Sequence, residues 1–281
     1  MKLLVTGSRG QLGRAMGRAA AARGLVFVGV DLPEFDVTDA AAVAETVALA
    51  RPDVIVNCAA YTAVDAAEDD EARATEVNGT AVGHLARSAD QVGALLVQVS
   101  TDYVFDGTAR RRYREDDPPR PTSAYGRSKL VGEAAAAAAR RHLIVRTAWL
   151  FGAGHNFVES IVGQVAAGAA SLRVVADQVG CPTYTEDLAA TILALVDRGS
   201  EGVFHAVNRG EVSWHGFAEE IVMRLGAEVP VTPISTAEAA RRAPRPAYGV
   251  LDTAKLESLL GAPLPPWQDA LGRYLSRRGR G

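Results

Sequence analysis

Tyr125 and Lys129 lie four residues apart, a spacing that places a phenol and an ammonium group on one face of a helix. A free phenol has a pKa of about 10 and is a weak acid at neutral pH. A nearby cation stabilises the phenolate and lowers that pKa. The pair therefore predicts a general acid that protonates an alkoxide. An isolated Tyr-x-x-x-Lys match has little weight, because both residue types are common on helix surfaces.

The hydroxyl of Thr101 belongs to the same chemistry. Thr101 follows a run of apolar, β-branched residues that predicts a strand, and it precedes Asp102 and Tyr103. Side chains at the carboxyl end of a parallel strand line the ligand crevice of an open α/β sheet. We therefore expect this hydroxyl to hydrogen-bond the substrate carbonyl that the phenol protonates, and to polarise it.

A glycine-rich turn, TGSRGQLG at residues 6–13, follows the first predicted strand directly. Its three glycines, Gly7, Gly10 and Gly13, allow a tight turn, a close approach of the backbone to a pyrophosphate, and close packing of the next helix. The start of that helix offers free N–H groups and the positive end of its dipole to phosphates. The position of the turn between strand and helix predicts a dinucleotide-binding site.

Two opposing signals leave the cofactor open between NADH and NADPH. Asp31 ends the second predicted strand, where a carboxylate accepts hydrogen bonds from an adenosine ribose and favours NADH. Arg9 lies within the glycine turn and is placed to reach a 2′-phosphate, which favours NADPH. The alternative role for Asp31 is that of a turn residue at a strand end.

The elements that must position these groups alternate between short β-branched runs and alanine-rich helical stretches. The predicted strands span residues 2–6, 26–30, 54–57, 94–100 and 143–147, and the predicted helices span residues 11–23, 40–50, 69–91 and 125–141. The apolar runs are continuous, so we expect strands that helices cover on both faces. This pattern predicts an α/β protein with a doubly wound, Rossmann-type parallel sheet.

The alternation weakens after Trp149, where a smaller C-terminal substrate-binding lobe is expected. We assign residues 1–150 to a dinucleotide-binding domain, joined by a returning segment near residues 176–208, and residues 151–281 to the lobe. Helices are predicted over residues 157–167, 188–196 and 267–277, and strands over residues 173–175 and 203–206. The lobe should cover the carboxyl ends of the sheet strands, where open α/β sheets bind ligands.

Composition narrows the classes of function. The chain has 30 Lys and Arg against 33 Asp and Glu, a formal charge of -3, which gives no basic excess for binding nucleic acid. No apolar run reaches the roughly 18 residues of a membrane span. Cys58 and Cys181 are far apart and are expected to be reduced thiols of a cytoplasmic protein. The five histidines and two cysteines lack zinc-site spacing, so no metal is predicted.

Together the motifs resemble the dTDP-4-dehydrorhamnose reductase family of extended short-chain dehydrogenases/reductases. The resemblance rests on TGSRGQLG (6–13), VNCAAYTAVD (56–65), STDYVFDG (100–107), YGRSKLVGE (125–133), RTAWL (146–150), DQVGCPT (177–183) and the Arg-Pro pair at 245–246. Cys58 stands where this family often has Ala, and Gly249 stands where its tail commonly has Ser. The resemblance implies reduction of the C4 ketone of dTDP-4-dehydro-L-rhamnose to dTDP-L-rhamnose with NADH or NADPH.

The resemblance also implies residue roles. Tyr125 would be the proton donor, Lys129 its electrostatic partner and a ribose ligand, and Thr101 the hydroxyl that tunes the pair. Gly7, Gly10, Gln11 and Leu12 would meet the pyrophosphate, Asp31 the ribose, Asp36 and Val37 the adenine region, and Ala60, Tyr61 and Thr62 the nicotinamide half. Thr101, Asp102 and Trp149 would contact the sugar nucleotide.

Three further residues have two interpretations each. Arg245 is expected to pair with the substrate diphosphate through two parallel hydrogen bonds, or else it is a solvated loop residue. Trp149 would stack on the deoxysugar, or else it is a buried aromatic at a strand end.

Some family members use magnesium at a subunit interface, and Glu186 lies in a comparable stretch. One carboxylate does not make a metal site, so none is predicted. A homodimer stays open.

Other functions compete with this interpretation. A 4-ketoreductase for another dTDP-deoxysugar would carry the same nucleotide-binding and proton-transfer residues. Sugar-nucleotide 4,6-dehydratases of this superfamily generally place an Asp-Glu pair after the active Thr, whereas Asp102 and Tyr103 follow Thr101 here. A non-catalytic regulatory subunit that binds a dinucleotide is the third alternative, because the accessory β subunit of methionine adenosyltransferase resembles this family.

Overall fold

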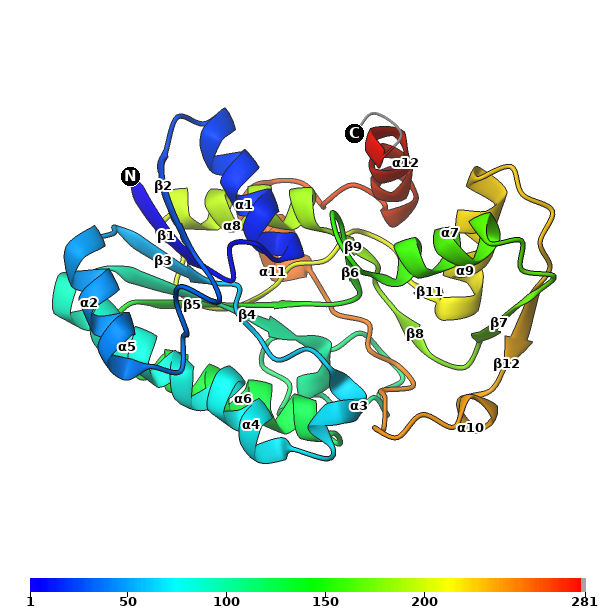
Figure 1. Cartoon of the computed structure of the whole chain (residues 1–281), viewed down its shortest axis with the longest axis horizontal. Helices are drawn as coiled ribbons and strands as arrows, with labels where there is room; N and C mark the ends of the chain where they lie inside the picture. The colour runs from blue at the N-terminus through cyan, green and yellow to red at the C-terminus, as the bar shows by residue number, and fades with distance from the viewer. Residues whose placement is uncertain (279–281) are drawn as a thin grey trace.

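A parallel sheet of six strands forms the centre of the computed structural model, which describes residues 1–278 (Figure 1). Its strands lie in the order β10, β5, β4, β3, β1 and β2, and every pairing is parallel. Their bounds are β1 (Lys2–Thr6), β2 (Val26–Val30), β3 (Val54–Asn57), β4 (Leu95–Thr101), β5 (His142–Thr147) and β10 (Gly202–His205). The expected doubly wound parallel sheet is confirmed.

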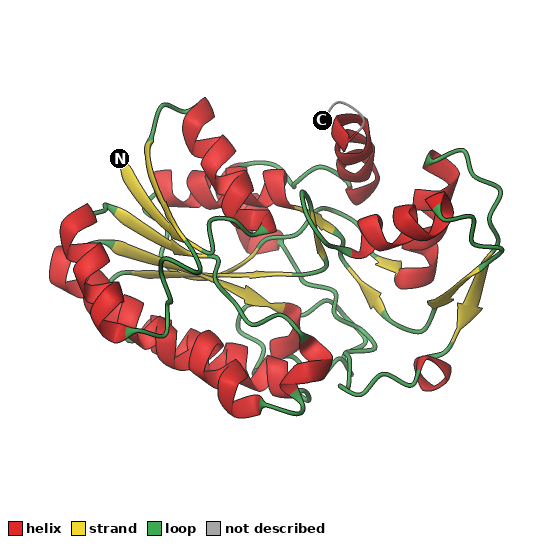
Figure 2. Cartoon of the chain, in the orientation of Figure 1, coloured by secondary structure: helices red, strands yellow, loops and turns green. Residues whose placement is uncertain are grey.

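Helices cover both faces of this sheet (Figure 2). On one face lie α1 (Gln11–Ala22), α8 (Thr185–Asp197) and α11 (Ala254–Leu260), whose apolar side chains form one core with Leu3 and Val5 of β1. On the other face lie α2 (Ala40–Ala50), α5 (Ala81–Val92) and α6 (Ala124–Ala137), which pack on Leu4 and Ile55. The strands can be continuously apolar because water reaches neither face. Edge strand β2 departs from this, and its Val26 is 54% exposed.

The predicted helix over residues 69–91 is interrupted. The chain forms α3 (Val64–Ala67), α4 (Glu71–Thr75), a π-helical turn η1 (Glu76–Thr80) and then α5. The wider turn faces α6, where a Cβ on Gly132 would lie 2.0 Å from the backbone oxygen of Asn78. A glycine in α6 therefore permits the close approach of the two helices. The predicted helix over residues 125–141 ends earlier, at Ala137, and a short turn leads from it to β5, which begins at His142.

The C-terminal lobe has its own apolar core, which lies beside the carboxyl ends of the sheet strands (Figure 1). Phe217 lies at its centre and is fully buried. The lobe's elements are β6 (Leu150–Phe151), α7 (Phe157–Ala166), β7 (Leu172–Val175), β8 (Val179–Gly180), β9 (Thr183–Tyr184), β11 (Val212–Ser213), α9 (Trp214–Arg224), β12 (Val231–Ile234), α10 (Thr236–Ala239) and α12 (Trp267–Arg278). A short 3₁₀ turn, η2 (Asp102–Val104), leads from β4 toward the lobe.

Several segments pass between the two regions. After the first lobe strands the chain returns to the sheet through α8 and β10, and β10 pairs with β5. It returns a second time through α11, whose Leu256 is fully buried in the sheet-side core. The domain boundaries at residues 150 and 151, with a returning segment near residues 176–208, stay a prediction.

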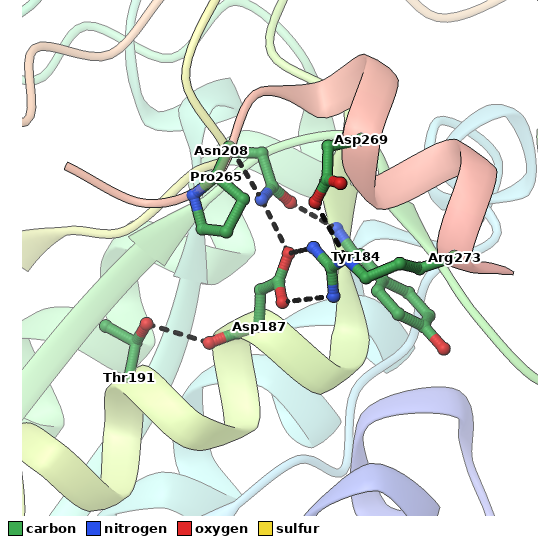
Figure 3. Close-up of polar contacts among 7 residues, drawn as sticks. All are labelled: Tyr184, Asp187, Thr191, Asn208, Pro265, Asp269 and Arg273. Carbon is green, nitrogen blue, oxygen red and sulfur yellow. Dashed lines mark hydrogen bonds and ion pairs between the residues drawn. The ribbon is translucent and has the colours of Figure 1, made fainter.

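A polar cluster fastens α12 to the start of α8 (Figure 3). Arg273 donates two hydrogen bonds to the Asp187 carboxylate, at 2.8 and 2.6 Å. Asn208, which is fully buried, donates to Asp187 at 2.7 Å and to the Pro265 oxygen at 2.9 Å, and it accepts from the Tyr184 backbone at 2.8 Å. The side chains of Asp187, Asn208 and Arg273 therefore all have hydrogen-bond partners, which is what burial requires.

We expect Asp187→Ala to lower the free energy of unfolding by about 1–3 kcal/mol, because the substitution leaves Asn208 and Arg273 without their shared acceptor. Asp197→Ala is the matched control, because Asp197 lies on the same helix and pairs with Arg23 at the surface. The control substitution should lower the free energy of unfolding by less than about 1 kcal/mol. Urea denaturation measures both, and equal losses would contradict the importance of this cluster.

Candidate active site

A cavity of about 510 Å³ opens where the carboxyl ends of β1, β3, β4 and β5 meet the lobe. It brings together residues that the sequence analysis took from motifs more than 100 positions apart. The predicted site residues that line it are Gly10, Gln11, Leu12, Ala60, Thr62, Thr101, Asp102, Tyr125, Lys129 and Trp149. The carboxyl edge of a parallel sheet is where such a constellation is expected to form.

The glycine turn has the shape that a pyrophosphate site needs. Gly7 has a φ of 62°, and a Cβ there would lie 2.6 Å from the backbone nitrogen of Ala59. A Cβ on Gly13 would lie 2.2 Å from the Gly7 oxygen, so the helix starts directly on the turn. Gly10 caps α1 without any side-chain hydrogen bond. The first N–H groups of the helix therefore face the cavity free to bind an anion.

A smaller cavity of about 370 Å³ continues past the glycine turn, and its lining includes Arg9, Asp31, Glu34 and Phe35. The Asp31 carboxylate accepts the Arg9 backbone N–H at 2.7 Å. The Arg9 guanidinium donates to the Leu32 oxygen at 2.6 Å and pairs with Glu34 at 2.8 Å. Asp31, which favours NADH, and Arg9, which favours NADPH, therefore line the same pocket.

Asp36 and Val37, which the resemblance placed near the adenine, do not line this pocket. Asp36 accepts hydrogen bonds from the backbone and hydroxyl of Thr38, at 2.9 and 2.8 Å, and these bonds lower its pKa. Val37 is buried in the core beneath α2 and α5. Phe35 occupies the pocket wall instead. The assignment of Asp36 and Val37 to the adenine region stays a prediction.

The loop after β3 is held by a residue that the sequence analysis missed. Asn78, in the π-helical turn, accepts from the Tyr61 backbone N–H at 2.9 Å and donates to the Tyr61 oxygen at 3.0 Å. It also donates to the Ser128 hydroxyl at 2.9 Å. Ala60 and Thr62 consequently face the cavity, whereas the Tyr61 ring packs beside Tyr125. π-Helical turns of this kind are frequent at functional sites.

Tyr125 and Lys129 both point into the cavity from α6, which begins with Ser123 as its N-cap. Lys129 is 3% exposed, and its ammonium donates to the Val99 backbone oxygen at 2.7 Å. Burial lowers the pKa of Lys129 to about 8, an effect opposed by the Glu133 carboxylate. Lys129 is therefore neither in bulk solvent nor bonded to the phenol.

The expectation that Lys129 makes the phenol more acidic stays a prediction, and the surroundings of Tyr125 in the chain alone act the other way. Burial raises the pKa of Tyr125 to about 12, the Asp102 carboxylate raises it further, and the Thr101 hydroxyl opposes the shift. Burial is the largest cause of this shift, and the Lys129 ammonium is bonded to the Val99 oxygen. Tyr125 is therefore a neutral phenol at neutral pH.

Thr101 and Asp102 form the polar end of β4. The Thr101 hydroxyl caps η2 by accepting the Tyr103 backbone N–H at 3.2 Å, and it lies 3.1 Å from an Asp102 carboxyl oxygen. Asp102 is 2% exposed. Burial raises the pKa of this carboxyl to about 7, against the effect of its hydrogen bonds to Thr101 and to backbone N–H groups.

Two tryptophans form the wall between this cavity and the lobe. Trp149 has a φ of 47°, a conformation that is strained for a bulky residue. Its ring stacks on Trp214 with a centroid distance of 3.5 Å and an interplanar angle of 8°. Trp149 therefore lines the cavity and also packs on an aromatic neighbour, and its contact with the deoxysugar stays a prediction. Trp214 was missed, because nothing in its local sequence distinguishes it from a core aromatic.

A second cavity of about 580 Å³ adjoins the first inside the lobe, and Tyr103 and Trp214 line both. Arg245 also lines it, with its guanidinium bonded twice to the Asp65 carboxylate, at 3.0 and 2.8 Å. The Arg245 guanidinium holds the pKa of Asp65 at about 2. Arg245 is thus an anchored cation at a cavity wall. Its predicted contact with a diphosphate stays a prediction.

Other expected features have plain structural partners. Glu186 accepts from the Arg18 guanidinium at 2.8 Å, so a magnesium ion would have to compete with an arginine there, and the residues do not fit that ion. Cys58 and Cys181 are both free thiols, as predicted. Within residues 1–278, no helix combines the length and apolar character required to cross a bilayer.

Comparison with known proteins decides the family. A family model described as the RmlD substrate binding domain matches residues 1–279. A dTDP-4-dehydrorhamnose reductase from Burkholderia thailandensis is 43% identical over 292 residues, which cover 97% of each chain. This chain belongs to the dTDP-4-dehydrorhamnose reductase family.

Two more comparisons refine this membership in the reductase family. The crystal structure of a dTDP-4-dehydrorhamnose reductase from Bacillus anthracis in complex with NADP is 35% identical, has a TM-score of 0.94, and covers 99% of this chain and 100% of that one. A probable dTDP-4,6-dihydroxy-2-methyloxan-3-one 4-ketoreductase from Streptomyces antibioticus is 44% identical over 278 residues, 96% of this chain and 93% of that relative. The resemblance drawn from the motifs is confirmed.

The neutral state of Tyr125 can be tested by titration of the cofactor-free protein. Ultraviolet difference absorbance between the native chain and Tyr125→Phe reports the tyrosinate of that residue. We expect no tyrosinate below about pH 10, because burial raises the pKa to about 12. An ionisation close to neutral pH would show instead that Lys129 controls the phenol.

Proposed function

We propose that this member of the reductase family reduces the C4 ketone of dTDP-4-dehydro-L-rhamnose to dTDP-L-rhamnose with NADPH or NADH. The observation that supports this proposal is the convergence of Tyr125, Thr101 and the glycine turn on one 510 Å³ cavity. The relatives that share most of the chain's length carry this activity in their names. The test is oxidation of each reduced cofactor with the dTDP-4-keto sugar, followed by analysis of the product.

The residues of the glycine turn fit a dinucleotide. Gly10, Gln11 and Leu12 would hold the pyrophosphate through backbone N–H groups, and the uncapped start of α1 adds its positive dipole. The Gln11 side-chain oxygen is buried and has no hydrogen-bond partner among the described residues, so a ligand group is expected there. When bound, the reduced nicotinamide supplies the hydride.

The chain's own residues supply the proton and hold the ketone. Tyr125 donates its phenolic proton to the oxygen at C4, and a phenol with a pKa of about 12 is still a stronger acid than the alcohol it forms. The Thr101 hydroxyl lines the same cavity as the phenol and would bond the same oxygen. Lys129 contributes a buried cation that favours negative charge in the cavity during proton transfer.

Cofactor preference follows from the pocket that holds Asp31 and Arg9. Asp31 would accept hydrogen bonds from a ribose, and Arg9 would reach a 2′-phosphate after leaving Glu34. The Arg9 guanidinium is exposed, so this move breaks only a surface ion pair of little energetic weight. The sequence analysis left NADH and NADPH open, and we propose that the pocket accepts either cofactor.

The second cavity would take the nucleotide end of the substrate. It joins the first at Tyr103 and Trp214, which supply aromatic surface for a ring. Arg245 and Arg241 supply positive charge at its wall. A sugar diphosphate nucleoside would then extend from Tyr125 into the lobe, with its diphosphate near Arg245.

A second candidate function is the reduction of another dTDP-linked 4-keto sugar. The 44% identity to the probable 4-ketoreductase from Streptomyces antibioticus favours this alternative, because it is one percentage point above the 43% identity to the rhamnose enzyme from Burkholderia thailandensis. Product analysis with several dTDP-4-keto sugars separates the two. A dehydratase would retain its cofactor through turnover. A regulatory subunit would oxidise no reduced cofactor in the presence of a dTDP-4-keto sugar.

Location and assembly complete the proposal. Two free thiols support a cytoplasmic enzyme, since reducing compartments preserve them. The partner is a dTDP-4-keto-6-deoxyhexose, and a homodimer is proposed as the assembly. Light scattering after gel filtration measures the subunit number.

We expect Tyr125→Phe to lower kcat by about 10²–10⁴-fold, the usual contribution of a positioned acid, while cofactor affinity stays nearly unchanged. Lys129→Ala should lower both kcat and cofactor affinity, because Lys129 is also a predicted ribose ligand. Steady-state assays and cofactor fluorescence titrations give the two quantities. Equal kcat of Tyr125→Phe and the native chain would refute the assignment.

The diphosphate contact can be tested by titration with dTDP. We expect Arg245→Ala to weaken binding about 10-fold, because a charge-assisted hydrogen bond to phosphate contributes about 1.5–3 kcal/mol. Arg242→Ala is the control, since Arg242 pairs with Asp69 and does not line the cavity. Equal affinities of the two variants for dTDP would remove Arg245 from the site.

A further inference from the structure

Thr147 has a hydroxyl to which the proposed reduction gives no role. Thr147 ends β5, is 4% exposed and lines the 510 Å³ cavity. Its hydroxyl oxygen is buried and has no hydrogen-bond partner among residues 1–278. A buried hydroxyl without a partner is unfavourable in the free protein, and such groups are few in folded chains. The partner of this hydroxyl must therefore come from outside the chain, as a ligand or a water molecule.

The strand directs Thr147 to the face of the sheet that carries the glycine turn. Successive side chains of a strand point to opposite faces. Val145, two residues before Thr147, packs in one core with Leu12 of α1, the helix that begins at the glycine turn. Tyr125 reaches the cavity from α6, which packs on the other face. The phenol and the Thr147 hydroxyl therefore approach the cavity from opposite faces of the sheet.

The register of the sheet sets Thr147 beside the threonine that is proposed to hold the ketone. In the pairing of β4 with β5, Thr101 and Thr147 are partners. Neighbouring strands lie about 4.8 Å apart, and paired residues point to the same face. In a reduced nicotinamide, the carbon that bears the carboxamide is bonded directly to the carbon that gives the hydride. A hydroxyl one strand away from Thr101 is therefore at a suitable spacing for the carboxamide.

We propose that the Thr147 hydroxyl binds the carboxamide of the nicotinamide ring. This inference rests on the proposed function. A threonine hydroxyl both donates and accepts, and a carboxamide offers an NH₂ group and a carbonyl oxygen, so each can satisfy the other. The contact would fix which face of the ring is turned toward Tyr125, because rotation of the ring about its bond to the ribose would carry the carboxamide away from Thr147. Thr147 is thus a cofactor-binding residue to which the family resemblance gave no role.

A hydroxyl of the sugar is the competing ligand group for Thr147. The sugar nucleotide is proposed to extend into the lobe, past Tyr103 and Trp214. Thr147 instead belongs to the central sheet. Within residues 1–278, Gln11 is the other residue of this cavity that has a buried oxygen without a partner, and Gln11 belongs to the glycine turn. The unpartnered oxygens therefore lie on the side of the cavity that is proposed to hold the cofactor.

The direct test compares the binding of NADPH with that of 2′-phospho-ADP-ribose, which has every part of NADPH except the nicotinamide ring. Isothermal titration calorimetry measures both affinities without turnover. We expect Thr147→Val to weaken NADPH binding about 10-fold, the effect of one hydrogen bond, and to leave phospho-ADP-ribose binding unchanged. Thr147→Ser keeps a hydroxyl and should restore most of the lost affinity. The same comparison applies to NADH and ADP-ribose.

Thr183→Val is the matched control. Thr183 is also buried, but its hydroxyl donates to the Cys181 oxygen at 3.1 Å and it does not line the cavity. The control should bind NADPH and phospho-ADP-ribose like the native chain. Urea denaturation of the cofactor-free protein separates the two threonines again. Thr147→Val removes an unpartnered hydroxyl and should keep or raise the urea midpoint, whereas Thr183→Val breaks a hydrogen bond and should lower it.

Four outcomes would overturn the assignment. Equal weakening of NADPH and phospho-ADP-ribose by Thr147→Val would give the residue a role in the fold or at the pyrophosphate. Native NADPH affinity with a raised KM for the keto sugar would make it a substrate contact. Native values of both would leave the hydroxyl to a buried water, and a lowered urea midpoint would show that it has a partner in the free chain.

Failure of the proposed function has a different signature. A native chain that binds NADPH but reduces no dTDP-4-keto sugar would refute the proposed reduction. The binding comparison between NADPH and phospho-ADP-ribose would still decide the role of Thr147, because it depends on no substrate.

Discussion

Removal of water from the carboxyl edge of the sheet is the constraint on which this site depends. Tyr125, Lys129 and Asp102 would each be ordinary surface groups if they were solvated. In the cavity burial disfavours their charged forms, so it raises the pKa values of the phenol and the carboxyl and lowers the pKa of the ammonium. A set of neutral donors around a ketone is suited to protonating an alkoxide, and the same desolvation strengthens each hydrogen bond made to it.

The fold creates that dry edge by bringing the lobe over the sheet. The lobe is fastened by crossings of the chain and by polar contacts such as those of Asp187 with Arg273 and Asn208. On the opposite side of the cavity, Arg245 of the tail reaches Asp65 in the loop after β3. The two sets of contacts hold the catalytic wall and the substrate wall in one arrangement, so the cavity depends on the whole chain.

Behind the catalytic wall, a fully buried ion pair supports β4 and α6. Arg146 of β5 donates to the Glu133 carboxylate at 2.9 and 2.7 Å, and Ser100 donates to the same carboxylate at 2.6 Å. Glu133 lies one helical turn after Lys129 and keeps part of its positive charge favourable. The pair thus links the strand that carries Thr101 to the helix that carries Tyr125, so that their relative position is specified by hydrogen bonds as well as by packing.

The sequence by itself determined the strand and helix order, the glycine turn and the family, because these depend on local periodicity and on residue spacing within one element. The first three strands, β1, β2 and β3, lie at their predicted bounds. Only the tertiary structure decided which side chains share an environment. It placed Asn78, Tyr103 and Trp214 at the site. It also buried Val37 and gave the Lys129 ammonium a hydrogen bond to the Val99 backbone oxygen. Burial and pairing arise between segments far apart in the chain, so residue type and spacing do not specify them.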